Sequence, residues 1–408
     1  MKVLFCKNSF AGPMSGADEI VVNYAIALRA AGHSPEVLLV HALAGDDPLA
    51  ARLRTAGVKL SSLVSPKLTG LLAGGRRVAI AATRVIRPAS RLIRTNSRNL
   101  VFDFIQRYQD RCREFLRRCQ PDIVHVMTPD PGAVMLIRAA HSVDLPVVYQ
   151  EVGMPFHPPG FEEVYQRFAS VLPLCSEVAT LSPRLAQEMH RVLPLDRAPH
   201  VVPLLSHAMA NGDGTLSNPV QSKSVRFGFA SRLEHLKGPV RLVHGFHIAH
   251  NEHPLIELRI AGDGSQRSEI LREVRRLGLE EKCSLVGVYT TMGERDRFLK
   301  EIDVFVLPSL TEGTPNAIIE AMAYAKPVIA TTVGGIPDLV NDDVGILVPP
   351  NNQAALGAAM SRLANDPKLR ERMGRAARKN YERTFTPQAV LPLLVDFYQN
   401  VIDRYSAA

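Results

Sequence analysis

Two positively charged side chains, Arg232 and Lys237, stand five residues apart just after an apolar run that ends at Ala230. The run predicts a buried strand over 225–230, which places both cations in a strand-to-helix loop. At this spacing they can converge on one polyanion, arginine as a two-pronged donor and lysine as a point charge. A diphosphate suits the pair, although two solvated surface cations are the alternative interpretation.

A second cluster follows the apolar run at 304–307 and resembles the start of a helix. Pro315 suits the first helical position, and the N–H groups of Asn316 and Ala317 then point out of the helix N-terminus as an anion site. Gly313 allows a ligand to approach the backbone closely. The segment therefore predicts a second phosphate-binding element.

Two glutamates flank this helix start, Glu312 before it and Glu320 about one turn inside it. The two carboxylates can bracket a phosphate, one contacting a sugar and the other a ribose, since a carboxylate accepts two vicinal hydroxyls in dinucleotide-binding folds. Glutamates near a helix start are also favourable with the helix dipole alone. That alternative explains either glutamate, but not the whole string.

The elements that position these residues alternate between strand and helix. Because 408 residues exceed the roughly 250 to 300 at which one hydrophobic core stops growing, we expect two domains. Apolar runs without alternation predict parallel strands covered on both faces. They occur at 2–6, 37–40, 122–127, 146–149, 225–230, 256–261, 284–288, 304–307, 327–330 and 345–348.

This pattern predicts an α/β fold with two Rossmann-like, doubly wound parallel-sheet domains facing across a cleft. We expect residues 1–207 to form the N-terminal domain, and 208–224, rich in small polar residues, to form a linker. Residues 225–385 then form the C-terminal domain. We expect the helix at 386–408 to pack back on the N-terminal domain.

The string Glu-Gly-Thr-Pro-Asn-Ala-Ile-Ile-Glu that begins at Glu312 resembles the signature of family 4 of the retaining GT-B glycosyltransferases. Four further segments are similar to that family in the expected order. They lie at 232–238, 260–264, 333–338 and 345–350. The resemblance is strong from about 225 to 350 and weaker before it.

The resemblance implies that 1–207 form the acceptor-side domain and that 225–385 bind the nucleotide sugar. Arg232 and Lys237 hold the diphosphate, Glu312 the donor sugar and Glu320 the ribose. The backbone from Gly313 to Ala317 meets the sugar and phosphates, and the loop after the strand at 284–288 holds the nucleobase. In these two segments, the residues expected to bind the donor are Gly287, Val288, Gly313, Thr314, Pro315, Asn316 and Ala317.

The N-terminal landmarks of the family are present in altered form. Ser15-Gly16-Ala17-Asp18 stands where the family has Gly-Gly-Ala-Glu, and Gly16 still permits close approach to the donor phosphate. His125 is present, but Met127 replaces a second histidine of the family pattern. A lone histidine at a strand end is often structural, so Glu151 and His157 are further candidates on the acceptor side.

The resemblance implies transfer of a hexose-type sugar from a nucleotide diphosphate sugar, with retention of configuration, in cell-surface polysaccharide or glycoconjugate synthesis. The acceptor is a glycan, a lipid-linked molecule or a small molecule. No Asp-x-Asp occurs, so we expect neither a metal nor a cofactor. The alternative is a non-catalytic nucleotide-sugar-binding or membrane-docked protein on the same scaffold.

Charge is concentrated in one segment. Residues 66–118 carry thirteen Lys and Arg against three acidic residues, whereas the rest of the chain is close to neutral. Interleaved apolar residues are typical of a helix on an anionic membrane surface, and a solvated basic face is the alternative. Aromatic residues are too sparse there for nucleic-acid binding. Five scattered cysteines favour a reducing cytoplasm, so we expect a cytoplasmic protein, peripheral on the membrane if the basic segment docks.

Overall fold

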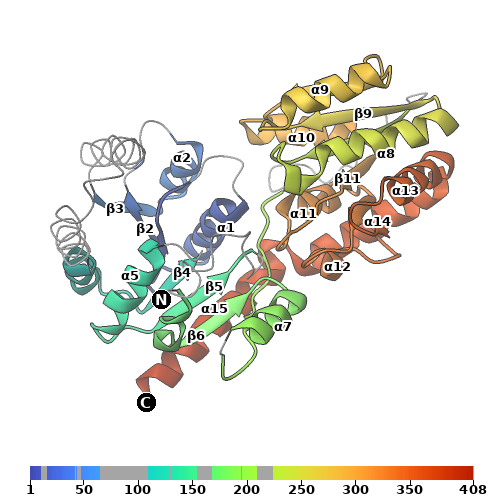
Figure 1. Ribbon diagram of the computed structural model, residues 1–408. Coiled ribbons are helices and arrows are strands. Elements are labelled where there is room, and N and C mark those ends of the chain that lie inside the picture. The colour runs from blue at the N-terminus through green and yellow to red at the C-terminus, as the bar shows by residue number, and fades with distance from the viewer. Residues whose placement is uncertain are drawn as a thin grey trace, which may run out of the picture. The chain divides into compact units, whose positions relative to one another are not determined.

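The computed structural model describes residues 1–10, 16–41, 43, 47–64, 109–127, 131–153, 168–193, 195–208 and 224–407. These residues divide into two compact units (Figure 1). The first comprises Met1–Thr180, Met189–His200 and Leu393–Ala408, and the second comprises Leu181–Glu188 and Val201–Pro392. Most of the expected linker, at 209–223, lies outside the described residues.

The first unit contains a seven-stranded sheet in the order β3-β2-β1-β4-β5-β6-β7, and the pairs from β3 to β6 are parallel. Its strands are β1 Val3–Lys7, β2 Glu36–His41, β3 Lys59–Val64, β4 Ile123–Met127, β5 Val147–Glu151, β6 Glu177–Thr180 and β7 His200–Val201. Its helices include α1 Gly16–Ala30, α2 Pro48–Thr55, α5 Pro131–His141 and the short η1 Leu172–Leu174, and a further helical segment spans 109–119. The apolar runs predicted β1, β2, β4 and β5 to within two residues, but not β3, β6 or β7.

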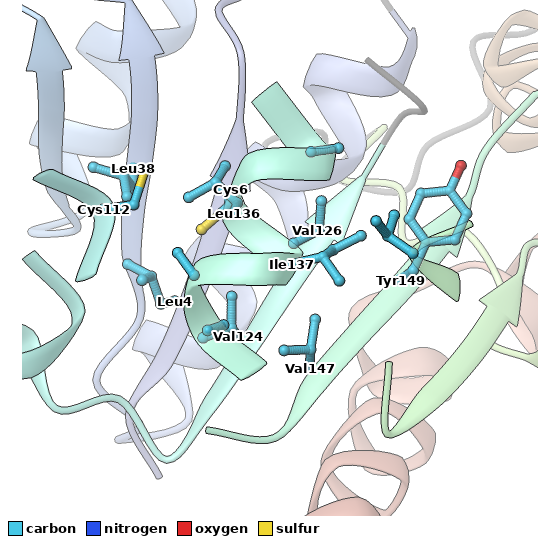
Figure 2. Packing of buried hydrophobic residues seen from close by; sticks show 14 of the residues in the cluster. Leu4, Cys6, Leu38, Cys112, Val124, Val126, Leu136, Ile137, Val147 and Tyr149 are labelled. Atoms are coloured by element: carbon cyan, nitrogen blue, oxygen red, sulfur yellow. The ribbon is translucent and has the colours of Figure 1, made fainter. Parts of the chain in front are cut away.

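One face of this sheet carries a large buried hydrophobic cluster of the first unit. Figure 2 shows Leu136 and Ile137 of α5 packed over side chains of β1, β4 and β5. Cys112, from the helical segment at 109–119, belongs to the same buried cluster as Leu38 of β2. The central strands are buried along their whole length, which explains why their sequences are apolar without alternation.

The second unit contains a six-stranded sheet in the order β10-β9-β8-β11-β12-β13, with every neighbouring pair parallel. Its strands are β8 Val225–Ala230, β9 Ile256–Ala261, β10 Cys283–Gly287, β11 Val304–Leu307, β12 Val328–Thr331 and β13 Gly345–Val348. Its helices are η2 His235–Lys237, α7 Pro183–Val192 in part, α8 Pro239–Glu252, α9 Arg267–Arg276, α10 Met292–Glu301, α11 Asn316–Ala323, α12 Ile336–Leu339, α13 Gln353–Asn365 and α14 Pro367–Thr384. Each strand lies within one residue of its predicted range. The prediction of two Rossmann-like parallel-sheet domains is therefore confirmed.

The last helix, α15 Pro387–Ser406, contributes to both units, because the division falls at Pro392 within it. Its second half is fixed to the first unit by several contacts. The Tyr398 hydroxyl lies 2.5 Å from His125 Nδ1, and the Arg404 guanidinium lies 2.7 Å from the Glu177 carboxylate. Among the described residues, no helix combines the length and apolar character needed to cross a membrane.

Candidate functional site

The candidate site of the second unit is built from loops that follow its parallel strands, at the carboxyl edge of the sheet. The loops after β8 and β11 are joined, since the Leu310 N–H donates to the Leu236 carbonyl at 2.8 Å. The loops after β11 and β12 are joined in the same way, by the Gly335 N–H and the Gly313 carbonyl at 3.0 Å. This edge is where open α/β sheets bind ligands.

Glycine makes the closest of these approaches possible. Gly238 follows η2 with a φ of +73°, and a Cβ there would lie 2.3 Å from the Pro308 carbonyl oxygen. Gly262, after β9, has a φ of +139° and would meet the Ser231 carbonyl at 2.0 Å. A side chain at either position would push the loops apart. Gly238 thus sets how close the Lys237 loop comes to the end of β11, and Gly262 sets how close the segments after β8 and β9 come to each other.

An ion pair joins two of the residues predicted from the sequence. Lys237 Nζ lies 2.7 Å from Glu312 Oε1, and the Ser309 hydroxyl donates to the same oxygen at 2.7 Å. The Glu312 side chain is buried, whereas the Lys237 side chain remains 19% exposed. An ammonium group has three N–H donors, so Lys237 can bind a further anion while it fixes Glu312.

The N-terminus of α11 lies directly after Glu312. Pro315 is the N-cap residue and the helix begins at Asn316, so the prediction that Pro315 opens the helix was one residue early. A helix leaves its first N–H groups without intrahelical partners and concentrates positive potential there. Thr314 is 7% exposed, and its hydroxyl has no hydrogen-bond partner within the described ranges. An anion or a polyhydroxyl ligand can satisfy both kinds of group.

Glu320 lies one turn further along α11 and is held by a residue that the sequence analysis did not identify. Arg295 of α10 places Nη1 3.1 Å from Glu320 Oε1. Arg295 is 8% exposed despite its charge. Nothing in the residue types around it, Gly-Glu-Arg-Asp-Arg, distinguishes this arginine from its exposed neighbour Arg297.

Three other predicted residues lie at the same edge with fewer contacts. Arg232 is exposed in the loop after β8 and forms no ion pair with any residue that the structure describes. Gly287 ends β10 with a φ of +80°, and its carbonyl accepts the Gly262 N–H at 2.8 Å. Val288 follows it and is partly exposed. These positions leave Arg232 and the β10 loop available to a ligand.

The N-terminal candidates lie in the first unit. His125 is fully buried in the middle of β4, and burial lowers its pKa from the ordinary value of 6.5 to about 3. The Nδ1 atom of this ring lies 2.5 Å from the Tyr398 hydroxyl of α15. Met127 ends the same strand and is also buried.

Glu151, Gly16 and His157 have different surroundings. Glu151 ends β5 and is buried, and it accepts the Tyr149 hydroxyl at 2.6 Å and the Gly153 N–H at 2.9 Å. Gly16 begins α1, and Asp18 in the first turn of that helix lies 2.8 Å from Lys7 Nζ. His157 lies outside the described residues, as does Ser15.

The histidines of α8 carry no metal-like arrangement. His244 Nε2 lies 2.8 Å from the Glu273 carboxylate of α9, and His247 lies 3.4 Å from Asn251. Over the part of the chain that the structure describes, no three histidine, cysteine or acidic side chains are grouped to hold a metal ion.

Two family models match the sequence, one in each half. The model described as Glycosyltransferase Family 4 matches residues 14–204, and the model described as Glycosyl transferases group 1 matches residues 217–380. Together they cover most of both compact units and every candidate donor-site residue.

Curated relatives match part of the chain. The alpha-maltose-1-phosphate synthase of Mycobacterium tuberculosis is 30% identical over 252 residues, which are 55% of this chain and 63% of that protein. The capsular polysaccharide biosynthesis glycosyltransferase CapM of Staphylococcus aureus is 30% identical over 176 residues, which are 43% of this chain and 46% of CapM. The chain thus spans less than two thirds of the length of either relative.

Solved structures match over nearly the whole chain. HepE of Anabaena, crystallised in complex with UDP, has a TM-score of 0.74 at 18% identity and covers 98% of this chain and 100% of its own. Sucrose-phosphate synthase of Thermosynechococcus elongatus has a TM-score of 0.72 at 17% identity and covers all of both chains. At these identities the likeness concerns the fold.

Proposed function

The chain belongs to the family 4 (group 1) glycosyltransferases and has their GT-B fold, and on this basis we propose that it transfers a hexose-type sugar from a nucleotide diphosphate sugar with retention of configuration. The acceptor is a glycan, a lipid-linked molecule or a small molecule. The reaction contributes to a cell-surface polysaccharide or glycoconjugate, which agrees with the similarity to CapM, a glycosyltransferase of capsular polysaccharide biosynthesis.

The observation that carries this proposal is the corner formed by Lys237, Glu312 and the N-terminus of α11. It combines a partly exposed ammonium, a fixed carboxylate and the buried Thr314 hydroxyl without a protein partner among the described residues. A buried hydroxyl without a partner costs free energy in the absence of ligand. A sugar diphosphate supplies acceptors for the hydroxyl and the N–H groups, and sugar hydroxyls that can donate to Glu312.

The chemistry required of this corner is to stabilise a departing diphosphate. Negative charge grows on the leaving phosphate oxygen, and Lys237, Arg232 and the α11 dipole provide fixed positive potential for it. The leaving oxygen can itself accept the proton of the acceptor hydroxyl, so the reaction needs neither a strong protein base nor a metal ion. That HepE was crystallised with UDP and with UDP-glucose supports a nucleotide-sugar donor for this chain.

The acceptor binds to the N-terminal domain in this proposal, with Glu151 and His157 as its candidate polar contacts. The enzyme works on the cytoplasmic side, and the basic segment 66–118 docks it on an anionic membrane beside a lipid-linked acceptor. Of this segment, only 109–118 lies among the described residues.

A panel of UDP-, GDP- and ADP-sugars tests the function through thermal shift and hydrolysis. A donor at a hundred times its dissociation constant should stabilise the protein by about 2.7 kcal/mol. Arg232→Ala and Lys237→Ala should each lower turnover by roughly a hundredfold or more without unfolding the protein. If no sugar nucleotide shifts the melting temperature, or if both variants turn over normally, the proposal fails.

A further inference from the structure

Arg295 is a buried cation whose partner belongs to the donor site. It projects from α10, and its Nη1 lies 3.1 Å from Glu320 Oε1, with side-chain exposures of 10% and 16%. A weaker contact of 3.4 Å joins Nη2 to the neighbouring Asp296. Burying a guanidinium costs free energy unless the group is paired, so Arg295 is not simply a surface charge that keeps the protein soluble.

The start of α10 holds Arg295 rigidly. Thr291 caps the helix, and its hydroxyl accepts the Glu294 N–H at 3.2 Å. In return, the Glu294 carboxylate accepts the Thr291 N–H at 3.1 Å. This reciprocal capping box immediately precedes Arg295, so the backbone that carries the Arg295 side chain is ordered by the helix cap.

Glu320 lies on the same partly exposed face of α11 as the residues at the helix N-terminus, where we place the anion site. Asn316, Ala317 and Glu320 are partly exposed, whereas the intervening Ile318 and Ile319 are buried. Residues three and four apart share one face of a helix, so the Glu320 carboxylate lies one turn along from the N–H groups of the helix N-terminus.

We propose that Arg295 is a positioning residue that keeps the Glu320 carboxylate oriented to accept the ribose hydroxyls of the donor nucleotide, and thereby makes the enzyme selective for ribonucleotides. The inference rests on the proposed function. The Arg295 guanidinium holds Glu320 Oε1 through Nη1 while Nη2 contacts Asp296, and a carboxylate held in one orientation can accept two vicinal hydroxyls. A donor that lacks the 2′-hydroxyl forfeits one hydrogen bond to a charged group.

Calorimetric binding of UDP and 2′-deoxy-UDP to the full chain tests this role, with the GDP and ADP pairs measured in parallel. The wild type should prefer the ribonucleotide by about tenfold or more, the usual effect of one hydrogen bond to a charged group. Arg295→Met should weaken binding of the ribonucleotide by about tenfold, leave the deoxynucleotide nearly unchanged and bring the ratio close to one. Arg295→Lys, which keeps the charge but not the planar guanidinium that reaches both Glu320 and Asp296, should fall between them.

Arg297→Met is the matched control, because Arg297 lies two residues along the same helix and is exposed. It should bind both nucleotides like the wild type. In steady-state assays Arg295→Met should raise KM for the donor much more than it lowers kcat, and adding it to Glu320→Gln should cause little further loss.

Three results separate the possible failures. If the wild type binds none of UDP, GDP and ADP, the proposed function and the role of Arg295 both fail. If the wild type binds a ribonucleotide and its deoxy form equally, or if Arg295→Met weakens both alike, only the role of Arg295 fails. If Arg295→Met does not fold, an Arg295→Lys variant with unchanged discrimination overturns the inference.

Discussion

Replacing Thr314 by valine should change stability and binding in opposite directions. Valine keeps the shape of the side chain and removes the hydroxyl, which is buried and has no protein partner within the described ranges. If that hydroxyl serves to bind the ligand, its removal breaks no hydrogen bond in the ligand-free protein and raises the free energy of unfolding. The ligand complex loses a hydrogen bond.

The magnitudes follow from these surroundings. A buried unsatisfied hydroxyl costs about 1–3 kcal/mol, so Thr314→Val should stabilise the ligand-free second unit by about 1 kcal/mol or more. A hydrogen bond to a charged phosphate contributes about 1.5–3 kcal/mol, so the dissociation constant of the sugar nucleotide should rise by about 10- to 100-fold.

Urea unfolding without ligand and calorimetric titration with the donor measure the two effects. Thr331→Val is the opposing control, because the Thr331 hydroxyl is buried and donates to the Ser309 carbonyl at 2.6 Å. That variant should be destabilised by about 1–3 kcal/mol. If Thr314→Val is destabilised like Thr331→Val and binds the donor normally, the Thr314 hydroxyl serves the free protein and our reasoning is refuted.

Three further outcomes are expected. Glu320→Gln should weaken binding of the free nucleotide, whereas Glu312→Gln should affect the sugar nucleotide more than the nucleotide alone; calorimetry with both ligands would contradict this division by showing equal losses. Burial lowers the pKa of His125 from 6.5 to about 3, so between these pH values the unfolded chain binds a proton that the folded chain does not. The neutral, buried His125 therefore allows full stability above pH 6.5, and this stability is lost as the pH falls toward 3. At pH 5 the first unit should have lost about 2 kcal/mol of its free energy of unfolding, and His125→Gln should show no such loss. Hydrogen exchange of β4 peptides gives the urea midpoint of unfolding at each pH, and parallel pH profiles for the wild type and His125→Gln would contradict the prediction. The protein should float with anionic but not neutral vesicles at low salt, and the difference should vanish when glutamine replaces the basic residues Arg84, Arg87, Arg91 and Arg94.

Local pattern was sufficient to predict most strands and the polar residues that follow them. The central strands are buried on both faces, so their apolar runs are visible in the sequence. By contrast, β3 is partly exposed and reads Lys-Leu-Ser-Ser-Leu-Val, which has no such run. In the first unit the prediction of strands thus succeeded for the fully buried β1, β4 and β5 and missed β3, β6 and β7. In the second unit the edge strands β10 and β13 were predicted although they are partly exposed, because their sequences still contain apolar runs.

Partners distant in the sequence could not be predicted from local pattern. His125 contacts Tyr398, which is 273 positions away, and Glu320 is held by Arg295 from a different helix. Neither contact can be predicted from residue spacing or composition, because each depends on how the helices pack against the folded sheet. The signature string predicted Glu312 and Glu320 but not the residues that orient them, Ser309 and Arg295.

The division of α15 between the two units has a consequence for the order of events during biosynthesis. The ribosome makes β1 to β6 of the first unit early, but residues 393–408, which belong to that unit, emerge only after the whole of 201–392. Until then, the Tyr398 hydroxyl that lies 2.5 Å from His125 in the finished protein does not exist. The second unit can therefore complete its core first, although it is encoded second, and the first unit must wait for it with one part of its core uncovered.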